Sequence, residues 1–141
     1  MLKALLSISL VAATAVTLIN FPIAKATADS RETCSQNRLD DESDGQFYRS
    51  AGVTGLTRER AISTLRRAEF HYSCSKNEEK LAEVRALLGN VDQIDFAKNR
   101  RVAVEQLRAY ITALKEAGQA GQENAINQTQ ARIKMIESLR D

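Results

Sequence analysis

The side chains best suited to nucleophilic, redox or zinc chemistry are rare in this chain, which has two cysteines, Cys34 and Cys74, and one histidine, His71. Together they are one ligand short of a closed structural zinc site, and no C-x-x-C-H haem motif is present. Two cysteines in a small chain favour a disulfide where the compartment is oxidising, because such a compartment permits the bond. We therefore predict a Cys34–Cys74 disulfide, no metal ion and no cofactor. His71 is predicted at a helix edge, without a catalytic role.

Residues 40–45, Asp-Asp-Glu-Ser-Asp-Gly, resemble the start of a calcium-binding EF-hand loop. Acids occupy its first, third and fifth positions, and glycine occupies the sixth. The twelfth position, which needs a bidentate glutamate, is Ala51. We therefore predict a solvated acidic segment that binds no metal.

Two carboxylate pairs, Glu78–Glu79 and Asp92 with Asp95, are candidates for acid–base chemistry. Each pair falls in the first turn of a predicted helix, where the positive end of the helix dipole favours acids in any case. The sequence has no G-x-S-x-G element and no glycine-rich phosphate loop. We therefore predict that the protein is not an enzyme.

Apolar residues at three- and four-residue steps predict two helices in the middle of the chain. The first begins at Thr57, whose hydroxyl can cap its first turn, and ends near Cys74. The second begins after Asn77, a favourable capping residue, and stops at Gly89.

Two further helices are predicted to form a C-terminal antiparallel hairpin. One is opened by Asp92 and Asp95 and runs to about Ala117, with a weak point at 99–101, and the other follows a short turn at 118–121. Their apolar positions repeat at matching spacing and predict a shared seam. The predicted seam residues are Val104, Leu107, Ile111 and Leu114 on one helix and Ile126, Ile133 and Ile136 on the other.

The segment 29–55 has little apolar periodicity, six acids and three glycines, Gly45, Gly52 and Gly55. We predict an irregular acidic arm over 29–55, which the disulfide holds down and in which a short helix after Cys34 is left open, preceding a helical domain over 56–141. No segment shows the alternation typical of strands. The predicted fold class is therefore all-α, a small bundle of about four helices with an irregular N-terminal arm.

Residues 1–28 have the three regions of a cleavable signal peptide. A positive start at Lys3 precedes an apolar run, Pro22 breaks it, and Ala26-Thr27-Ala28 offers a cleavage site. The alternative is an uncleaved anchor, since the apolar run could nearly span a bilayer. We predict cleavage after Ala28, a periplasmic or secreted protein, and no stable membrane anchor once the leader is removed.

Removal of the leader leaves a chain without net charge. All 18 acidic residues lie at or after Asp29, and of the 20 basic residues Lys3 and Lys25 lie in the leader, which leaves 18. A nucleic-acid partner predicts a basic excess. We therefore predict no nucleic-acid partner.

The acidic and basic residues are unevenly distributed along the chain. The stretch 49–67 has five arginines against Glu59, whereas the stretch 29–45 has six acids against two arginines. Complementary charge predicts either that the arm is fastened to this stretch or that it masks a face for an acidic partner. The predicted partner-binding residues are Arg58, Arg60, Arg66 and Arg67.

The predicted function is that of an exported, non-catalytic helical protein, which acts by protein–protein interaction in the bacterial envelope or exterior. One alternative is a periplasmic stress chaperone for unfolded clients. Leu56-Thr57 is similar to the start of the L-T-x-x-Q element of small periplasmic stress chaperones, but Arg60 stands in place of its Gln. Another alternative is a secreted enzyme or effector without a recognisable motif. An oligomer is compatible with all three.

Overall fold

The computed structural model describes residues 32–140, and within that range the chain is all-α, as predicted. The predicted signal peptide lies outside the described residues. These residues form two compact units, one ending at Phe96 and the other running from Ala97 to Arg140. The helices, with the 3-10 helix labelled η1, are α2 (Arg38–Val53), α3 (Arg58–Ser75), α4 (Glu78–Gly89), η1 (Val91–Gln93), α5 (Phe96–Ala117) and α6 (Gln122–Ser138).

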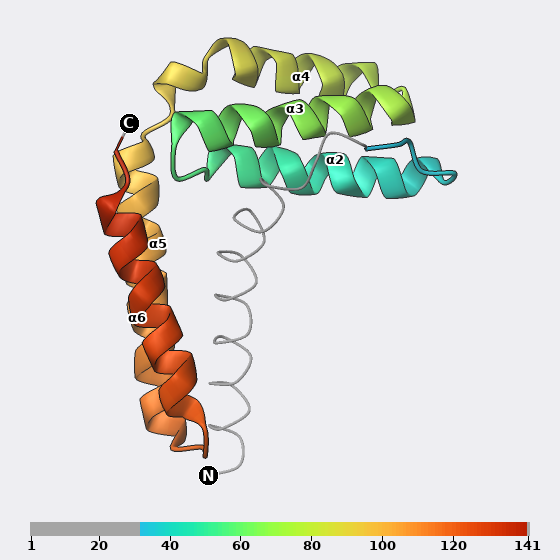
Figure 1. The fold of residues 1–141 in the computed structure, drawn as a ribbon. Helices are drawn as coiled ribbons and strands as arrows, with labels where there is room; N and C mark the ends of the chain where they lie inside the picture. Colours follow the sequence, from blue (N-terminus) through green and yellow to red (C-terminus); the bar gives the residue numbers. More distant parts are fainter. Residues whose placement is uncertain (1–31, 141) are drawn as a thin grey trace. The chain divides into compact units, whose positions relative to one another are not determined.

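Helix α3 is the centre of the first unit, with α2 on one side and α4 on the other (Figure 1). The predicted start of α3 is confirmed, since the Thr57 hydroxyl accepts a hydrogen bond from the backbone N–H of Arg60 at 3.3 Å. The predicted start of α4 is also confirmed, because the Asn77 side chain accepts from the N–H of Lys80 at 3.2 Å. Both caps satisfy donors that a helix leaves free in its first turn.

Helix α2 corrects the prediction that 29–55 is irregular. Its buried residues fall at the three- and four-residue spacing of a helix face and are Asp41, Gly45, Tyr48, Ala51 and Gly52. A carboxylate and two glycines interrupt this face, so a search for apolar periodicity does not detect it. The EF-hand-like residues 40–45 lie in the same helix and therefore do not form a calcium-binding loop.

The glycines of α2 allow α2 and α3 to approach each other closely, and they do not break the helix. A Cβ atom at Gly45 would lie 2.9 Å from the Tyr72 ring, and one at Gly52 would lie 2.6 Å from the Leu65 side chain. Gly45 and Gly52 are seven residues apart on α2, as Leu65 and Tyr72 are on α3. The two missing side chains therefore make room for two large ones, and α2 and α3 pack closely along their length.

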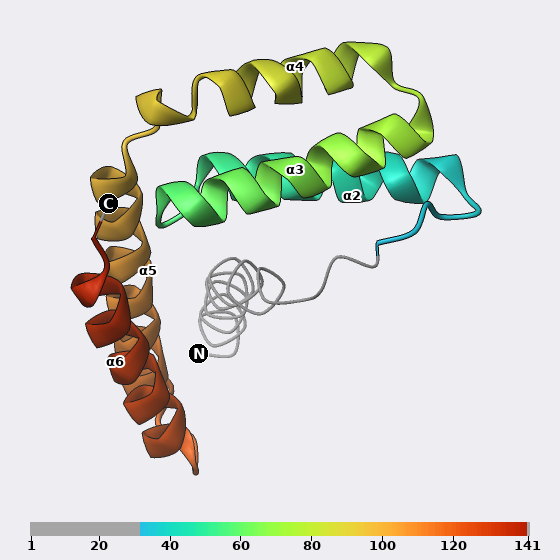
Figure 2. The ribbon, with the colours of Figure 1, turned by 45° about the horizontal axis from the view of Figure 1, so that its top comes forward.

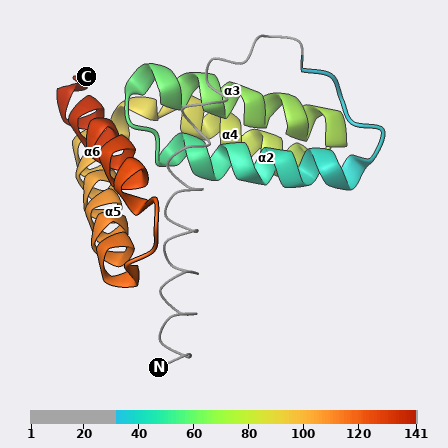
Figure 3. The ribbon, with the colours of Figure 1, turned by 60° about the horizontal axis from the view of Figure 1, so that its bottom comes forward.

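The second unit contains α5 from Ala97 onward and α6. These helices lie side by side and run in opposite directions in every view (Figures 1, 2 and 3). Gly118 and Gly121 in the connecting turn have φ values of 60° and 81°, which glycine adopts without a steric penalty. Residues 99–101 are helical, so α5 has no break at the predicted weak point.

Most residues of the predicted seam are buried. Val104, Leu107, Ile111, Ile133 and Ile136 are buried, whereas Leu114 and Ile126 are half-buried. An ion pair of 3.1 Å between Arg108 Nη2 and Glu137 Oε1 also joins the two helices. Which side chain meets which across the seam stays a prediction.

Truncation of the seam should be costly. We expect Leu107→Ala to lower the free energy of unfolding by about 2–4 kcal/mol, because Leu107 is buried and its loss leaves a cavity. The matched control is Val102→Ala on the same helix, where the side chain is exposed and the change should be small. Urea unfolding of both variants gives the comparison. A loss from Leu107→Ala as small as that from Val102→Ala would contradict a seam buried within the monomer.

Candidate functional site

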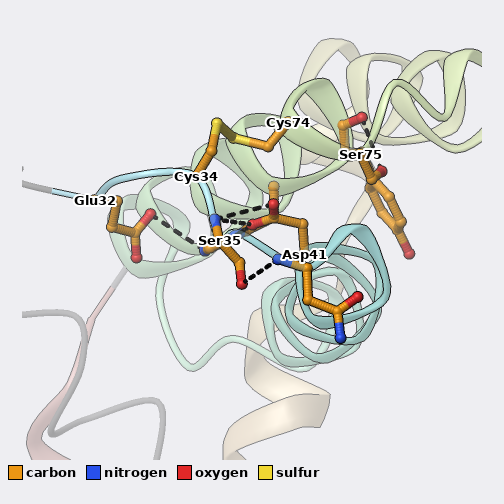
Figure 4. The surroundings of a disulfide bond; sticks show 9 residues. Glu32, Cys34, Ser35, Asp41, Cys74 and Ser75 are labelled. Carbon is orange, nitrogen blue, oxygen red and sulfur yellow. Dashed lines mark hydrogen bonds and ion pairs between the residues drawn. A yellow bond between two sulfur atoms is a disulfide. The ribbon is translucent and has the colours of Figure 1, made fainter.

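The predicted disulfide between Cys34 and Cys74 is present (Figure 4). Its two Cα atoms lie 5.5 Å apart, and Cys74 belongs to the last turn of α3. Cys34 is exposed and Cys74 is half-buried. The bond therefore fastens the segment that precedes α2 to the C-terminal end of α3.

A buried carboxylate, Asp41, lies beside the disulfide (Figure 4). Only 1% of Asp41 is exposed, although it belongs to the first turn of α2. Its two oxygens accept from the backbone N–H of Ser35, at 3.1 and 3.3 Å. One oxygen also lies 2.9 Å from Nδ1 of His71. These partners compensate the loss of water that burial imposes on a carboxylate.

His71 is buried between α2 and α3, which corrects its predicted place at a helix edge. Its Nε2 lies 3.7 Å from Oε2 of Glu32, so the two ring nitrogens face two different carboxylates. The ring also stacks on Tyr48 of α2, with centroids 5.5 Å apart. Of these two contacts, the one between Nδ1 and Asp41 is within hydrogen-bond distance, whereas the one between Nε2 and Glu32 is longer.

Glu32 is held in turn by Arg67 of α3, through an ion pair and a hydrogen bond. The Arg67 guanidinium lies over the Tyr48 ring, 4.5 Å from its centroid, in a cation–π contact. Glu32 and Arg67 are both largely buried. Together, Glu32, Asp41, Arg67 and His71 form a connected polar network, called the strap network below, because it holds residues 32–37 against α3.

Tyr72, the neighbour of His71 on α3, packs against Gly45. Burial raises the pKa of the Tyr72 phenol above its usual value, and the nearby positive charges of Arg49 and Lys80 partly offset this shift. The phenol therefore remains protonated at neutral pH and is a packing group.

The four predicted partner-binding arginines have different surroundings. Arg58 is exposed and pairs with Asp92 at 2.7 Å, and Arg60 is half-buried, with a buried Nη1 that has no hydrogen-bond partner. Arg67 is engaged in the strap network. Arg66 is exposed and has no ion pair within residues 32–140. Of the four, Arg66 is thus the one that is exposed and has no ion pair among the described residues.

Glu78 and Glu79 lie in the first turn of α4, as the dipole argument predicts. Asp92 and Asp95 correct the prediction that they open the next long helix, because Asp92 belongs to the short helix η1, Asp95 precedes Phe96, and the first turn of α5 has no acid. Sequence reasoning missed the roles of Glu32 and Asp41. The helical spacing of Asp41, Gly45, Tyr48 and Gly52 is the signal that could have revealed the buried carboxylate.

Comparisons of the chain with protein-family models, curated proteins and solved structures found no match. No helix between residues 32 and 140 combines the length and apolar character needed to span a membrane.

Proposed function

We propose that this is an exported, non-catalytic protein that acts by binding another protein through its helical surface. The observation that carries the proposal is that the rarest reactive side chains of the chain have structural contacts. The only histidine and both cysteines of the chain hold residues 32–41 against α3. The residue types that most often serve as base or nucleophile in hydrolytic sites are therefore committed to structure.

The disulfide supports export of the chain. It is the kind of bond that persists in the periplasm or outside the cell, where thiols are not kept reduced. In this proposal residues 1–28 direct the chain there and are removed. The mature protein then begins near Asp29, a few residues before the strap network.

The surface of the first unit supports a binding role. Leu39 in the first turn of α2 is 69% exposed, and Phe47 on the same helix is 37% exposed. Exposed apolar and aromatic side chains contribute much of the binding energy in protein interfaces. Arg66 adds an exposed positive charge on α3, without an ion pair to any residue from 32 to 140, that suits an acidic partner surface.

A site-specific crosslinking experiment tests the proposal. A photoreactive amino acid is placed at Leu39 or at Arg66 in the exporting cell, with Gln130, an exposed residue of α6, as the matched control. We expect one adduct of defined mass from Leu39 or Arg66 and none from Gln130. Mass analysis of the uncrosslinked chain should show a new N-terminus at Asp29 or Thr27.

The competing functions predict different products. Many adducts of different mass would indicate a chaperone of unfolded clients, and the absence of adducts at both positions would contradict a binding role for this surface. Intact Met1 in the membrane fraction would establish an anchor. Arg66→Ala should weaken binding more at low salt than at high salt and leave the melting temperature unchanged.

A further inference from the structure

The acidic residues of the EF-hand-like stretch have different surroundings, because the stretch is helical. Asp41 is buried in the strap network, and Glu42 pairs with Arg38 one turn earlier, at 3.4 Å. Asp40 and Asp44 are exposed, and neither forms an ion pair with another described residue. The helix therefore presents two carboxylates to solvent, one turn apart.

The physics of the isolated helix accounts for only one of these two acids. Asp40 lies in the first turn of α2, where the helix dipole favours an acid, and it accepts a hydrogen bond from the Ser35 hydroxyl at 3.4 Å. Asp44 lies one turn further, beyond the reach of that effect, and like charges four residues apart on a helix repel each other. A positive charge placed between Asp40 and Asp44 would replace this repulsion by attraction.

A second row of exposed side chains runs along α2 beside the acidic row. Leu39, Ser43 and Phe47 follow one another at four-residue steps, and all three are exposed. Phe47 contacts the Tyr48 ring edge to face, with centroids 5.3 Å apart, and is still 37% exposed. Rows at four-residue steps are the ridges that pack into the grooves of another helix, and the small Ser43 leaves a gap between two large side chains.

We propose that this outer face of α2, formed by Leu39, Asp40, Ser43, Asp44 and Phe47, binds an amphipathic helix of the partner protein that has lysine or arginine beside its apolar side chains. The inference rests on the proposed function, because it names the chemistry of the partner surface. Basic side chains of the partner lie against the two carboxylates, and its apolar side chains pack against the row with the gap. Complementary charge of this kind fixes the orientation of the two helices and speeds their encounter.

The charge of this face disfavours other occupants. Two copies of the chain related by a two-fold axis would bring the same patch into contact with itself, so the carboxylates of both copies would repel each other. An anionic lipid surface would be repelled for the same reason. Arg66 belongs to α3 and not to this face, so an acidic contact there involves a different part of the partner.

A binding experiment with the purified full chain tests the charge preference. The probe is a fluorescent helical peptide of leucine and lysine, with all leucines on one face, and the control probe has glutamate in place of lysine. We expect the lysine peptide to bind, more weakly as salt rises, and the glutamate peptide not to bind. Leu39→Ser should also weaken binding of the lysine peptide, because the exposed apolar row loses its largest contact area.

Two double variants with the same change in net charge form the matched comparison. Asp40→Asn/Asp44→Asn should weaken binding of the lysine peptide by about 10-fold, the loss of two exposed ion pairs. Glu105→Gln/Glu116→Gln removes two exposed carboxylates from α5 and should leave the affinity unchanged. All four carboxylates are exposed, so circular dichroism should show the same helix content in both variants.

A crosslink in the exporting cell identifies the occupant itself. A photoreactive residue at Ser43 should give an adduct whose partner peptide has lysine or arginine at three- or four-residue steps, and Asp40→Asn/Asp44→Asn should lower its yield. Equal affinity of the two double variants for the lysine peptide, an adduct on an acidic segment, or an adduct with a second copy of this chain would each overturn the inference. An adduct at Leu39 whose yield is independent of Asp40 and Asp44 would also overturn it but would leave the proposed function standing, whereas the absence of adducts at Leu39 and Arg66 would contradict the proposed function as well.

Discussion

Replacing Asp41 by alanine is expected to lower the free energy of unfolding by about 1–3 kcal/mol, the cost of leaving a buried hydrogen-bonding group without its partner. The change leaves His71 buried without an acceptor at Nδ1 and leaves the N–H of Ser35 without its carboxylate. His71 is buried, so solvent does not replace its missing partner, whereas Ser35 is exposed and its N–H can bond to water. Urea unfolding monitored by circular dichroism measures the effect.

The matched control is Asp44→Ala, three residues further along the same helix. Asp44 is exposed, so its removal should change stability by no more than about 0.5 kcal/mol. A double-mutant cycle with Asp41→Asn and His71→Gln isolates the pair itself and should give a coupling energy of about 1–3 kcal/mol. A coupling energy near zero would show that His71 and Asp41 are neighbours without a stabilising interaction.

The second large effect is expected from Cys74→Ser, which removes the disulfide. The two cysteines are 40 residues apart, and the chain-entropy model gives a loss of about 4 kcal/mol for a loop of this size. The reason is that the reduced unfolded chain has many more conformations than the cross-linked one. Thermal unfolding of Cys34→Ser/Cys74→Ser, compared with the unmodified chain, measures this loss without an unpaired thiol.

A control for the disulfide lies next to it. Ser73→Ala changes an exposed residue of the same helical turn and should leave the melting temperature nearly unchanged. Mass analysis of the purified protein without reductant should find Cys34 and Cys74 joined. Rapid alkylation of both thiols in the native oxidised protein would contradict the disulfide. It would also remove the argument for an oxidising compartment.

The Asp41→Ala and Cys74→Ser experiments distinguish two ways in which the segment before α2 is held against α3. The disulfide acts mainly on the unfolded chain, whereas the strap network acts in the folded protein. The effect of Cys74→Ser should therefore depend little on salt. Glu32 and Arg67 are largely buried, so high salt should weaken their pair less than it weakens the exposed pair of Arg58 with Asp92.

The sequence by itself determined the fold class, the helices from Thr57 onward and the disulfide. Those helices have local signals that need no partner to be recognised, such as a side chain that caps a free N–H, an apolar residue at each turn and a glycine at the end. The disulfide could be predicted from the number of cysteines, since two cysteines allow only one intramolecular pairing.

Only the tertiary structure decided that residues 38–53 are a helix and that His71 has a buried role. The inner face of α2 contains an aspartate and two glycines, and each is favourable only because of a particular residue on α3. Asp41 needs His71, Gly45 makes room for Tyr72, and Gly52 makes room for Leu65. Arg67 likewise differs from its neighbour Arg66 because Glu32, 35 residues away, reaches it. Propensity and periodicity describe one segment at a time, whereas these choices depend on pairs of residues that meet only after the chain has folded.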